Sequence, residues 1–352
     1  MRSLVTFILL SSFLANAGMS QEKAAYKRSL ILMGTAFEIT AVSDNEALAI
    51  KSIDAAIAEI QRIERLISSW NSNSQTSVIN KNAGIKPVSV DKELFDLITR
   101  SLKVSKLTEG AFDVSYAAVD KIWKFDGSMT KLPSDEDVRS SISLINFENI
   151  LLNEDESTVF LKKEGMKIGF GGIGKGYAAN KAMKLMKEMG ITGGVVNASG
   201  DLITWGKQEN GGDWRIGISD PKSPDNVMAW LVVGDMAVIT SGNYEKFFMN
   251  KGKRYAHIID PRTGYPTTGI KSVTIVCPDA ELGDALATSV FVLGELDGMS
   301  LINTLKGIEG LVITDDDRLI SSNNLKLNYY QTAKEKESSP VNYLTGKKIK
   351  NE

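Results

Sequence analysis

GFGGIGKG, at residues 169–176, puts five glycines into eight positions just before a segment with helical periodicity. Glycine lets backbone N–H groups come close to a ligand, and a helix N-terminus favours negative charge. We therefore predict a loop that binds an anion, most naturally a phosphate, with Lys175 beside it. The competing interpretation is a tight helix–strand contact that needs glycine and binds nothing.

Two familiar patterns match this loop, and the rest of the chain argues against both. Gly169, Gly171 and Gly174 satisfy the GxGxxG pattern of dinucleotide-binding folds, but a parallel-sheet context and a carboxylate about 20 residues on are not evident. The GxxxxGK pattern of P-loops is also met, but Gly176 stands where such a loop needs Ser or Thr for its metal. Strands and helices are mixed without strict alternation, which favours an α+β fold.

Apolar periodicity gives the elements of that fold. It predicts helices at residues 46–67, 92–107, 177–189 and 283–293, and strands at residues 29–42 (broken at 33–35), 159–167, 194–197, 202–205, 214–219, 228–233, 237–240, 254–259 and 271–277. The last two strands are expected to continue one sheet. We predict a single compact domain over residues 26–330, with a mixed, mostly antiparallel sheet and flanking helices, and a polar tail over residues 331–352.

Histidine and cysteine are almost absent, which removes whole classes of site. His257 is the one histidine and Cys277 the one cysteine in 352 residues. A zinc site with several His ligands and an internal disulfide are both excluded, so a metal site must consist mostly of oxygen ligands, which favours Mg²⁺ or Ca²⁺. The formal net charge of −2 gives no basic surface for nucleic acid.

The first residues have the pattern of a secretory signal peptide. Arg2 precedes an apolar run over residues 4–14, and Ala15-Asn16-Ala17 supplies small residues at the spacing that signal peptidase accepts. The run is too short to span a bilayer, which takes about 20 helical residues. We predict that residues 1–17 are a signal peptide, that the protein is exported, and that the mature chain has no transmembrane helix. The alternative is a buried N-terminal helix.

Two further segments carry side chains suited to chemistry. Asp284 and Thr288 are one helical turn apart, so their oxygens share a face that suits a hard cation, although an Asp near a helix start is often only a cap. His257 lies where a strand runs into a turn through Pro261 and Gly264, and functional residues often lie on such loops. A satisfied structural histidine is the alternative for His257.

Taken in order, eight segments of the chain resemble the FAD:protein FMN transferase family, also called the ApbE family. They are MGTAFEI (33–39), SSWN (68–71), GAFDV (110–114), GGIGKGYA (171–178), VNASGD (196–201), TSGNYEKFF (240–248), YAHIIDPRTGYP (255–266) and GDALATSVFVLG (283–294). Their shared order along most of the chain makes the resemblance specific.

The resemblance implies an activity and a set of site residues. FAD would be the substrate and Mg²⁺ the cofactor; a Thr or Ser hydroxyl of an acceptor protein would take FMN through a phosphoester bond while AMP leaves. Gly172 (through its carbonyl), Asp284 and Thr288 would bind Mg²⁺. His257 would be needed for activity, either to take a proton or to orient a phosphate. The FAD site would be lined by Met33, Trp70, Ala111, Phe112, Asp113, Lys175 and Ile258. Family members typically act outside the cytoplasm, so we expect the protein in the periplasm, in solution or loosely associated with the inner membrane.

At one position the chain departs from the family pattern. The family often has an acidic residue where this chain has Gly169, three positions before Gly172. The FAD site thereby loses a carboxylate that would serve as a binding contact or as a base. Other functions stay open: a FAD pyrophosphatase that releases FMN and AMP, a non-catalytic exported flavin-binding protein, and an enzyme of unrelated chemistry on a similar fold.

Overall fold

The computed structural model describes residues 22–329, apart from 120–121, 126–127, 130, 221–222, 243–246 and 251, together with residues 341–342 and 347–348. The predicted signal peptide, residues 1–17, lies outside the described residues. So does most of the predicted polar tail over residues 331–352. Both remain predictions.

The centre of the molecule is an eight-stranded sheet with the strand order β1-β2-β6-β7-β10-β13-β14-β15. The strands are β1 (Ala24–Leu32), β2 (Thr35–Ser43), β6 (Gly193–Ala198), β7 (Asp201–Trp205), β10 (Ala237–Gly242), β13 (Ile270–Cys277), β14 (Glu309–Thr314) and β15 (Leu319–Ser321). Every neighbouring pair in this sheet is antiparallel. The α+β prediction is therefore confirmed, and the sheet is antiparallel throughout rather than mixed.

The hairpin of β1 and β2 explains the break predicted at residues 33–35. Leu32 pairs with Thr35, so only Met33 and Gly34 connect the two strands. Both have a positive φ, 50° at Met33 and 76° at Gly34, which is the geometry that a two-residue hairpin turn requires. The turn places Met33 at the end of the sheet that carries the site described below.

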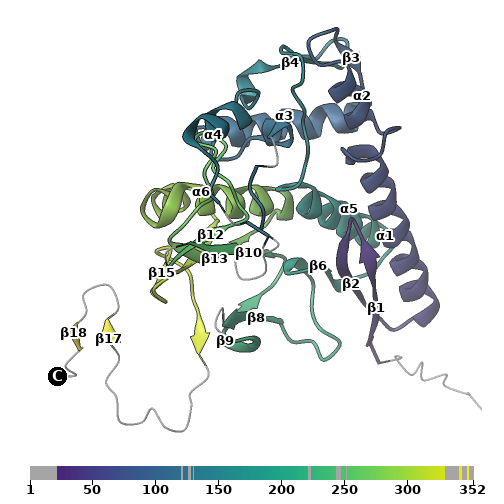
Figure 1. Cartoon of the computed structure of the whole chain (residues 1–352). Coiled ribbons are helices and arrows are strands. Elements are labelled where there is room, and N and C mark those ends of the chain that lie inside the picture. The colour runs from purple at the N-terminus through teal and green to yellow at the C-terminus, as the bar shows by residue number, and fades with distance from the viewer. Residues whose placement is uncertain are drawn as a thin grey trace, which may run out of the picture.

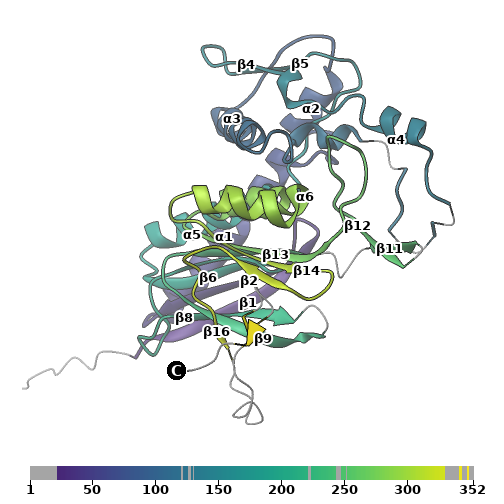
Figure 2. The same cartoon turned by 90° about the vertical axis from the view of Figure 1, so that its left-hand side faces the viewer.

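Three helices cover one face of this sheet: α1 (Glu46–Ile67), α5 (Gly174–Glu188) and α6 (Ala280–Thr304), as Figures 1 and 2 show. Their apolar faces and the facing side chains of the sheet form the main core. The predicted helix at residues 46–67 matches α1, but α5 begins at Gly174, three residues before the predicted start. In α6, Gly294 (φ 87°, ψ 176°) interrupts the helical backbone, one residue after the predicted end of a first helix.

Among the described residues, α6 is also the one helix long and apolar enough to cross a membrane by length and composition. It packs against β13, β10 and α5, and 56% of its most apolar window is buried inside the protein. Such a helix is expected in the core of a folded domain, because its apolar surface already has protein neighbours.

A second, three-stranded sheet covers the opposite face of the main sheet (Figure 2). It consists of β8 (Trp214–Asp220), β9 (Ser223–Val233) and β16 (Asn328–Tyr329), and it encloses a separate apolar cluster that includes Trp214 and Leu231. The strands predicted at residues 214–219 and 228–233 are thus present, but they belong to this second sheet.

A further group of elements lies beyond the helices, away from the sheet (Figure 1). They are α2 (Gln75–Lys81), α3 (Lys92–Leu107), α4 (Asp135–Ser141), the two 3₁₀ turns η1 (Val114–Ala118) and η2 (Phe147–Asn149), and the small sheet of β3 (Val88–Ser89), β5 (Thr158–Leu161) and β4 (Ile150–Asn153). The strand predicted at residues 159–167 ends at Leu161, because the chain bends and turns over residues 162–165.

One predicted strand has a different partner from the one expected. Residues 254–259 were expected to continue the main sheet, but β12 (Lys253–Ala256) pairs with β11 (Phe247–Asn250) in a separate two-stranded hairpin. His257 therefore follows the end of the strand instead of lying within it. The hairpin contributes Phe248 of β11 to a small aromatic cluster, where its ring stacks on Trp123.

Candidate active site

A cleft of about 580 Å³ lies between the glycine loop, the start of α6 and the segment that follows β12. All the residues predicted for the site line it, although they come from positions spread over more than 250 residues of sequence. They are Met33, Trp70, Ala111, Phe112, Asp113, Gly172, Lys175, His257, Ile258, Asp284 and Thr288. The structure thus brings together every predicted site residue, while the role of each one stays a prediction.

The glycine loop makes a tight contact, but between two helices and not between a helix and a strand as the competing interpretation expected, and anion binding stays a prediction. A Cβ on Gly176 would lie 2.0 Å from the carbonyl oxygen of Ala280, so glycine is needed where the first turn of α5 meets the first turn of α6. A Cβ on Gly171 would meet nothing within 4 Å, so that part of the loop borders the open cleft. One end of the loop joins the two helices, and the other end is open to a ligand.

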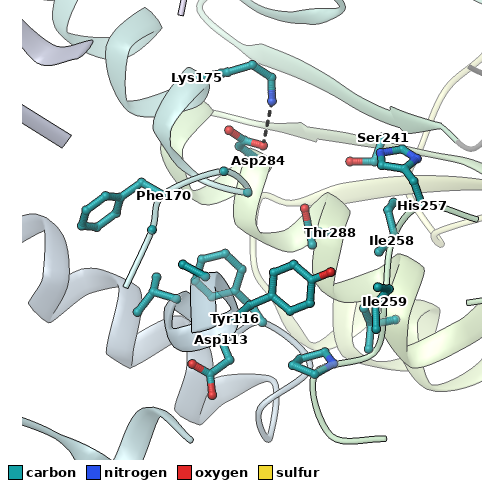
Figure 3. A pocket seen from close by; sticks show the side chains of 18 of the residues that line it. Asp113, Tyr116, Phe170, Lys175, Ser241, His257, Ile258, Ile259, Asp284 and Thr288 are labelled. Atoms are coloured by element: carbon teal, nitrogen blue, oxygen red, sulfur yellow. Dashed lines mark ion pairs between the residues drawn. The ribbon is translucent and has the colours of Figure 1, made fainter. Parts of the chain in front are cut away.

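Lys175 lies between two buried carboxylates at the floor of the cleft. Its Nζ is 2.6 Å from Oδ2 of Asp201 and 3.5 Å from Oδ1 of Asp284. Figure 3 shows the Lys175 side chain directed at Asp284. The backbone N–H of Gly176 donates to Oδ2 of Asp284 at 3.1 Å, which fixes the orientation of that carboxylate. One positive and two negative groups thus meet in the cleft.

Charge neutralisation explains how these groups coexist away from water. Burial lowers the pKa of Lys175, but the carboxylates of Asp284 and Asp201 outweigh burial and hold this pKa above its ordinary value. Burial and the Asp284 carboxylate raise the pKa of Asp201, and Lys175 opposes that shift. The lysine is therefore an ammonium at neutral pH, and its charge stabilises both carboxylates.

The oxygen groups at the start of α6 fit a hard divalent cation. Asp284 and Thr288 project from one face of α6 toward the glycine loop (Figure 3), and a Cβ on Gly172 would lie 3.1 Å from Oγ1 of Thr288. Carboxylate, hydroxyl and carbonyl oxygens are the ligands that Mg²⁺ takes in proteins. Across the described part of the chain, no three His, Cys, Asp or Glu side chains gather as a metal site. The Thr288 hydroxyl and the Gly172 carbonyl would therefore have to complete the ligand set beside the Asp284 carboxylate.

Asp113 organises the wall opposite α6. Its Oδ1 accepts hydrogen bonds from the backbone N–H of Ser115 (2.7 Å) and from the Ser115 hydroxyl (2.6 Å), and its Oδ2 accepts one from the N–H of Phe147 (2.8 Å). Burial raises its pKa, and these three hydrogen bonds oppose the shift. The carboxylate caps the 3₁₀ turn η1, and in this way it holds Ala111 and Phe112 against the cleft.

His257 and Ile258 belong to a short two-stranded extension beyond β12. The N–H of Ala256 donates to the carbonyl of Thr267 (3.1 Å), and the N–H of Thr267 donates to the carbonyl of Ile258 (2.9 Å). The His257 side chain is exposed within the cleft, and Figure 3 shows it on the side away from the glycine loop. The backbone around His257 is therefore held by hydrogen bonds while its imidazole faces the cleft.

Trp70 is the most exposed large apolar side chain of the site. Its indole is 83% exposed although it lines the cleft, so it lies at the opening. The loop after it is held by the N-cap Ser74, whose backbone N–H donates to the carbonyl of Asn71 at 3.1 Å. An exposed aromatic ring on an ordered loop is suited to stack on a planar ligand.

Gly169 leaves little room for the acidic residue of the family pattern. A Cβ at this position would lie 3.0 Å from Cβ of Ala117 and 3.7 Å from Oγ of Ser69. The N–H of Gly169 donates to the carbonyl of Val114 at 2.9 Å, so the backbone is fixed against the wall of the cleft. The neighbouring side chains therefore leave space for glycine at position 169 and little for a larger residue.

Sequence reasoning missed several residues that line the cleft, above all Asp201, Tyr116 and Ser241. Burial raises the pKa of Tyr116 to about 12, so its hydroxyl stays a hydrogen-bond donor. The signal for Asp201 in the sequence is its place directly after Ser199-Gly200. In the structure, this pair has positive φ and closes the β6–β7 hairpin. A buried carboxylate beside such a tight turn needs a partner, and Lys175 is that partner.

Comparisons with known proteins agree with this geometry. The model of the ApbE family matches residues 33–312. A curated FAD:protein FMN transferase of Treponema pallidum is 31% identical over 84% of this chain and 86% of its own length, and one of Klebsiella pneumoniae is 29% identical over 88% and 95%. Among solved structures, the ApbE protein of Thermotoga maritima superposes with a TM-score of 0.77 at 30% identity, covering 85% of this chain and 97% of that one. The flavin transferase ApbE of Vibrio cholerae gives 0.76 at 25% identity over 86% and 98%.

Proposed function

The chain belongs to the ApbE family, and from this premise we propose that it is a Mg²⁺-dependent FAD:protein FMN transferase. It is a transferase that takes FAD as substrate and a protein as acceptor. The observation that carries the finer proposal is the meeting of Lys175, the open glycine loop, Asp284 and Thr288 in one cleft. These groups supply charge and backbone N–H donors where the pyrophosphate of FAD would react.

The reaction is a phosphoryl transfer between two oxygens. The hydroxyl oxygen of a Thr or Ser in the acceptor attacks the phosphorus on the FMN side of FAD, and a new P–O bond forms. The bond from that phosphorus to the bridging oxygen breaks, and AMP leaves with the electron pair. The hydroxyl proton passes to a base or to water. Such a reaction depends mainly on positioning and on neutralising charge on the phosphate oxygens.

Lys175 and the glycine loop would bind the pyrophosphate. The Lys175 ammonium is held at the floor of the cleft by two carboxylates, and the N-terminus of α5 adds the positive end of a helix dipole. Asp284, Thr288 and the carbonyl of Gly172 would hold Mg²⁺, which when bound neutralises the phosphate oxygens in the transition state. Asp284 is pre-oriented for this by the N–H of Gly176.

The flavin ring would lie toward the opening of the cleft. Trp70 offers an exposed indole there, and Met33 and Phe112 add apolar surface on either side. A ring stacked on Trp70 would also cover the reacting phosphorus and limit the access of water. This is the feature by which the site would favour transfer to a protein over hydrolysis.

His257 would act on the acceptor side of the phosphorus. It is exposed within the cleft on the segment after β12, where an incoming hydroxyl can approach. Its imidazole would take the hydroxyl proton in the transition state, as a general base. Orientation of a phosphate oxygen is the alternative role.

We propose that export by residues 1–17 brings this site to acceptors in the periplasm.

One experiment separates the transferase from the two other flavin functions. Purified protein is incubated with FAD and Mg²⁺, with and without a Thr-containing acceptor protein, and AMP and protein-bound FMN are quantified by chromatography and mass spectrometry. We expect AMP release that depends on the acceptor, in equal amount to FMN gained by it. AMP release of the same rate without acceptor would establish a pyrophosphatase, and FAD binding without AMP release would establish a carrier.

A further inference from the structure

Asp201 is a buried carboxylate of the cleft that is assigned neither to the metal site nor to phosphate binding. It is 3% exposed and lies at the first position of β7, directly after the tight turn at Ser199-Gly200. Its nearest charged partner is Lys175, at 2.6 Å, and the backbone N–H of Thr240 also donates to it. A buried carboxylate is costly unless its partners are fixed, so its position must be maintained by a specific interaction.

The two distances around Lys175 are unequal. Nζ lies 2.6 Å from Asp201 but 3.5 Å from Asp284, so the ammonium lies closer to Asp201 than to Asp284. Oδ2 of Asp284 accepts the N–H of Gly176, which leaves Oδ1 as the oxygen facing the cleft. That oxygen is also the one nearest to Lys175, so the lysine and a cation at Thr288 would compete for it.

We propose that Asp201 is a positioning residue that holds Lys175 away from Asp284, and thereby keeps Asp284 able to bind the metal ion. When both carboxylates are ionised, they and the one ammonium leave the cluster with one excess negative charge, which attracts a divalent cation. Without the charge of Asp201, Lys175 pairs with Asp284 alone, the excess charge disappears, and the cation must displace the lysine. This inference rests on the proposed function only in placing a divalent cation at Asp284.

The test measures binding of Mn²⁺, which takes oxygen ligands as Mg²⁺ does and is detected as the free ion by electron paramagnetic resonance. It uses the full-length mature protein without FAD or acceptor. Four variants are compared with wild type: D201N, K175M, the double variant K175M/D201N, and D284N as the reference for loss of the site. D297N, an exposed position of the same helix as Asp284, serves as the matched control.

We expect D201N to weaken Mn²⁺ binding by about tenfold or more, because one nearby charge is lost and Lys175 turns to Asp284. The double variant is expected to recover to within about threefold of wild type, because the competing ammonium is gone as well. K175M alone should bind Mn²⁺ at least as tightly as wild type. Recovery on adding a second substitution is the readout that separates positioning from simple damage to the fold.

Three results would overturn the inference: unchanged Mn²⁺ affinity in D201N, a double variant as weak as D201N, or K175M weaker than wild type. If D284N binds Mn²⁺ like the wild type, or the wild type binds none, the metal assignment of the proposed function fails as well. Loss of binding in D284N with no change in D201N would remove only the role of Asp201. Thermal melting of each variant by circular dichroism shows that the folded protein is being measured.

Discussion

At the scale of single residues, Asp284 combines a fixed orientation with an exposed oxygen. One oxygen accepts the N–H of Gly176 at 3.1 Å, and the other faces Thr288 and Lys175 in the cleft. Asp284→Ala removes the charged metal ligand, so we expect Mg²⁺-dependent FMN transfer to fall by about a thousandfold or more. FMN on the acceptor, measured by mass spectrometry over a Mg²⁺ titration, checks this. Asp297→Ala on the same helix should transfer at the wild-type rate, and full activity of Asp284→Ala would refute the metal site.

Gly169 tests whether the missing acidic residue matters in this chain. A new Cβ would meet Ala117 at 3.0 Å, so both Gly169→Ala and Gly169→Asp should lower the free energy of unfolding by about 1 kcal/mol. The difference between the two variants then reports the effect of charge. We expect Gly169→Asp to bind FAD more weakly than Gly169→Ala, because its carboxylate would face the pyrophosphate beside Ser69 with no cation matched to it. Fluorescence titration with FAD measures both. Tighter binding by Gly169→Asp would mean that a carboxylate at this position assists, as in the family pattern.

At the scale of elements, the start of α5 is joined to the start of α6 by one glycine. A Cβ on Gly176 would overlap the carbonyl oxygen of Ala280 at 2.0 Å, whereas a Cβ on Gly171 would meet nothing within 4 Å. Gly176→Ala should therefore lower the free energy of unfolding by about 3 kcal/mol. Gly171→Ala, in the same loop, should change it by less than about 0.5 kcal/mol. Denaturant unfolding of the two variants checks the contrast, and equal stability would refute the contact.

The aromatic cluster beside β11 and β12 holds the segment that carries His257. The Trp123 indole N–H donates to the carbonyl of Gly264 at 2.8 Å, and its ring stacks on Phe248 with centroids 6.0 Å apart. Trp123→Phe keeps an aromatic ring but leaves the Gly264 carbonyl without this donor, at a cost of about 1 to 3 kcal/mol. We expect kcat for FMN transfer to fall while the affinity for FAD is unchanged, because Trp123 contacts the His257 segment and not the cleft. A change in FAD affinity alone would contradict this assignment.

The sequence predicted best those elements whose signals are local. The helices at residues 46–67 and 92–107 have the predicted bounds because apolar periodicity marks them. In α1 a cap adds to this signal, since the side chain of Asn45 accepts the N–H of Leu48 at 3.0 Å. The start of α5 was placed too late because glycines at 174 and 176 read as loop, and the contact with α6 that makes them helical is not local. Likewise β12 has the periodicity of a sheet strand, but periodicity does not name its partner β11.

In the candidate site, too, local signals were predictable from the sequence and non-local contacts were not. The eleven predicted residues were found because each stands in a recognisable segment, and all of them line one cleft. Asp201 was missed although VNASGD was noted, because its importance comes from Lys175, which lies 26 positions earlier in the sequence. Asp113 was placed among the cleft residues, but the direction of its carboxylate toward Ser115 and Phe147 depends on the fold around η1.

At the scale of the whole molecule, one ionic network ties the helical elements together behind the site. Glu93 of α3 accepts two hydrogen bonds from Arg62 of α1, both at 2.8 Å, and one from the Tyr177 hydroxyl in the first turn of α5 at 2.5 Å. In parallel, Arg100 of α3 donates to Glu281 in the first turn of α6 at 2.6 and 3.0 Å. The helix α3 thus fixes the first turns of α5 and α6, which carry Lys175 and Asp284.

This network predicts how the stability of the protein depends on pH. The hydrogen bonds from Arg62 are the largest cause that lowers the pKa of Glu93 to about 2, with Tyr177 and Lys181 adding to them and burial opposing. A carboxylate whose pKa is lower in the folded state stabilises the protein above its unfolded pKa, and the stabilisation is lost as the pH falls toward the folded value. For Glu93 this window runs from about pH 4.5 down to about pH 2. Because Glu93 is partly exposed, we take its contribution as on the order of 2 kcal/mol.

Glu93→Gln removes that charge without shortening the side chain. We expect a Tm several degrees lower at pH 7, a difference that shrinks steadily between pH 4.5 and pH 2 because the wild type loses the same interaction on protonation. Scanning calorimetry from pH 7 to pH 2 measures both curves, and Glu209→Gln, at an exposed loop position, should follow the wild type throughout. Glu93 reaches the site only through α5. The same substitution should therefore weaken FAD binding by only about threefold or less. A Tm difference that stays constant down to pH 2 would show that Glu93 acts through packing and not through its charge.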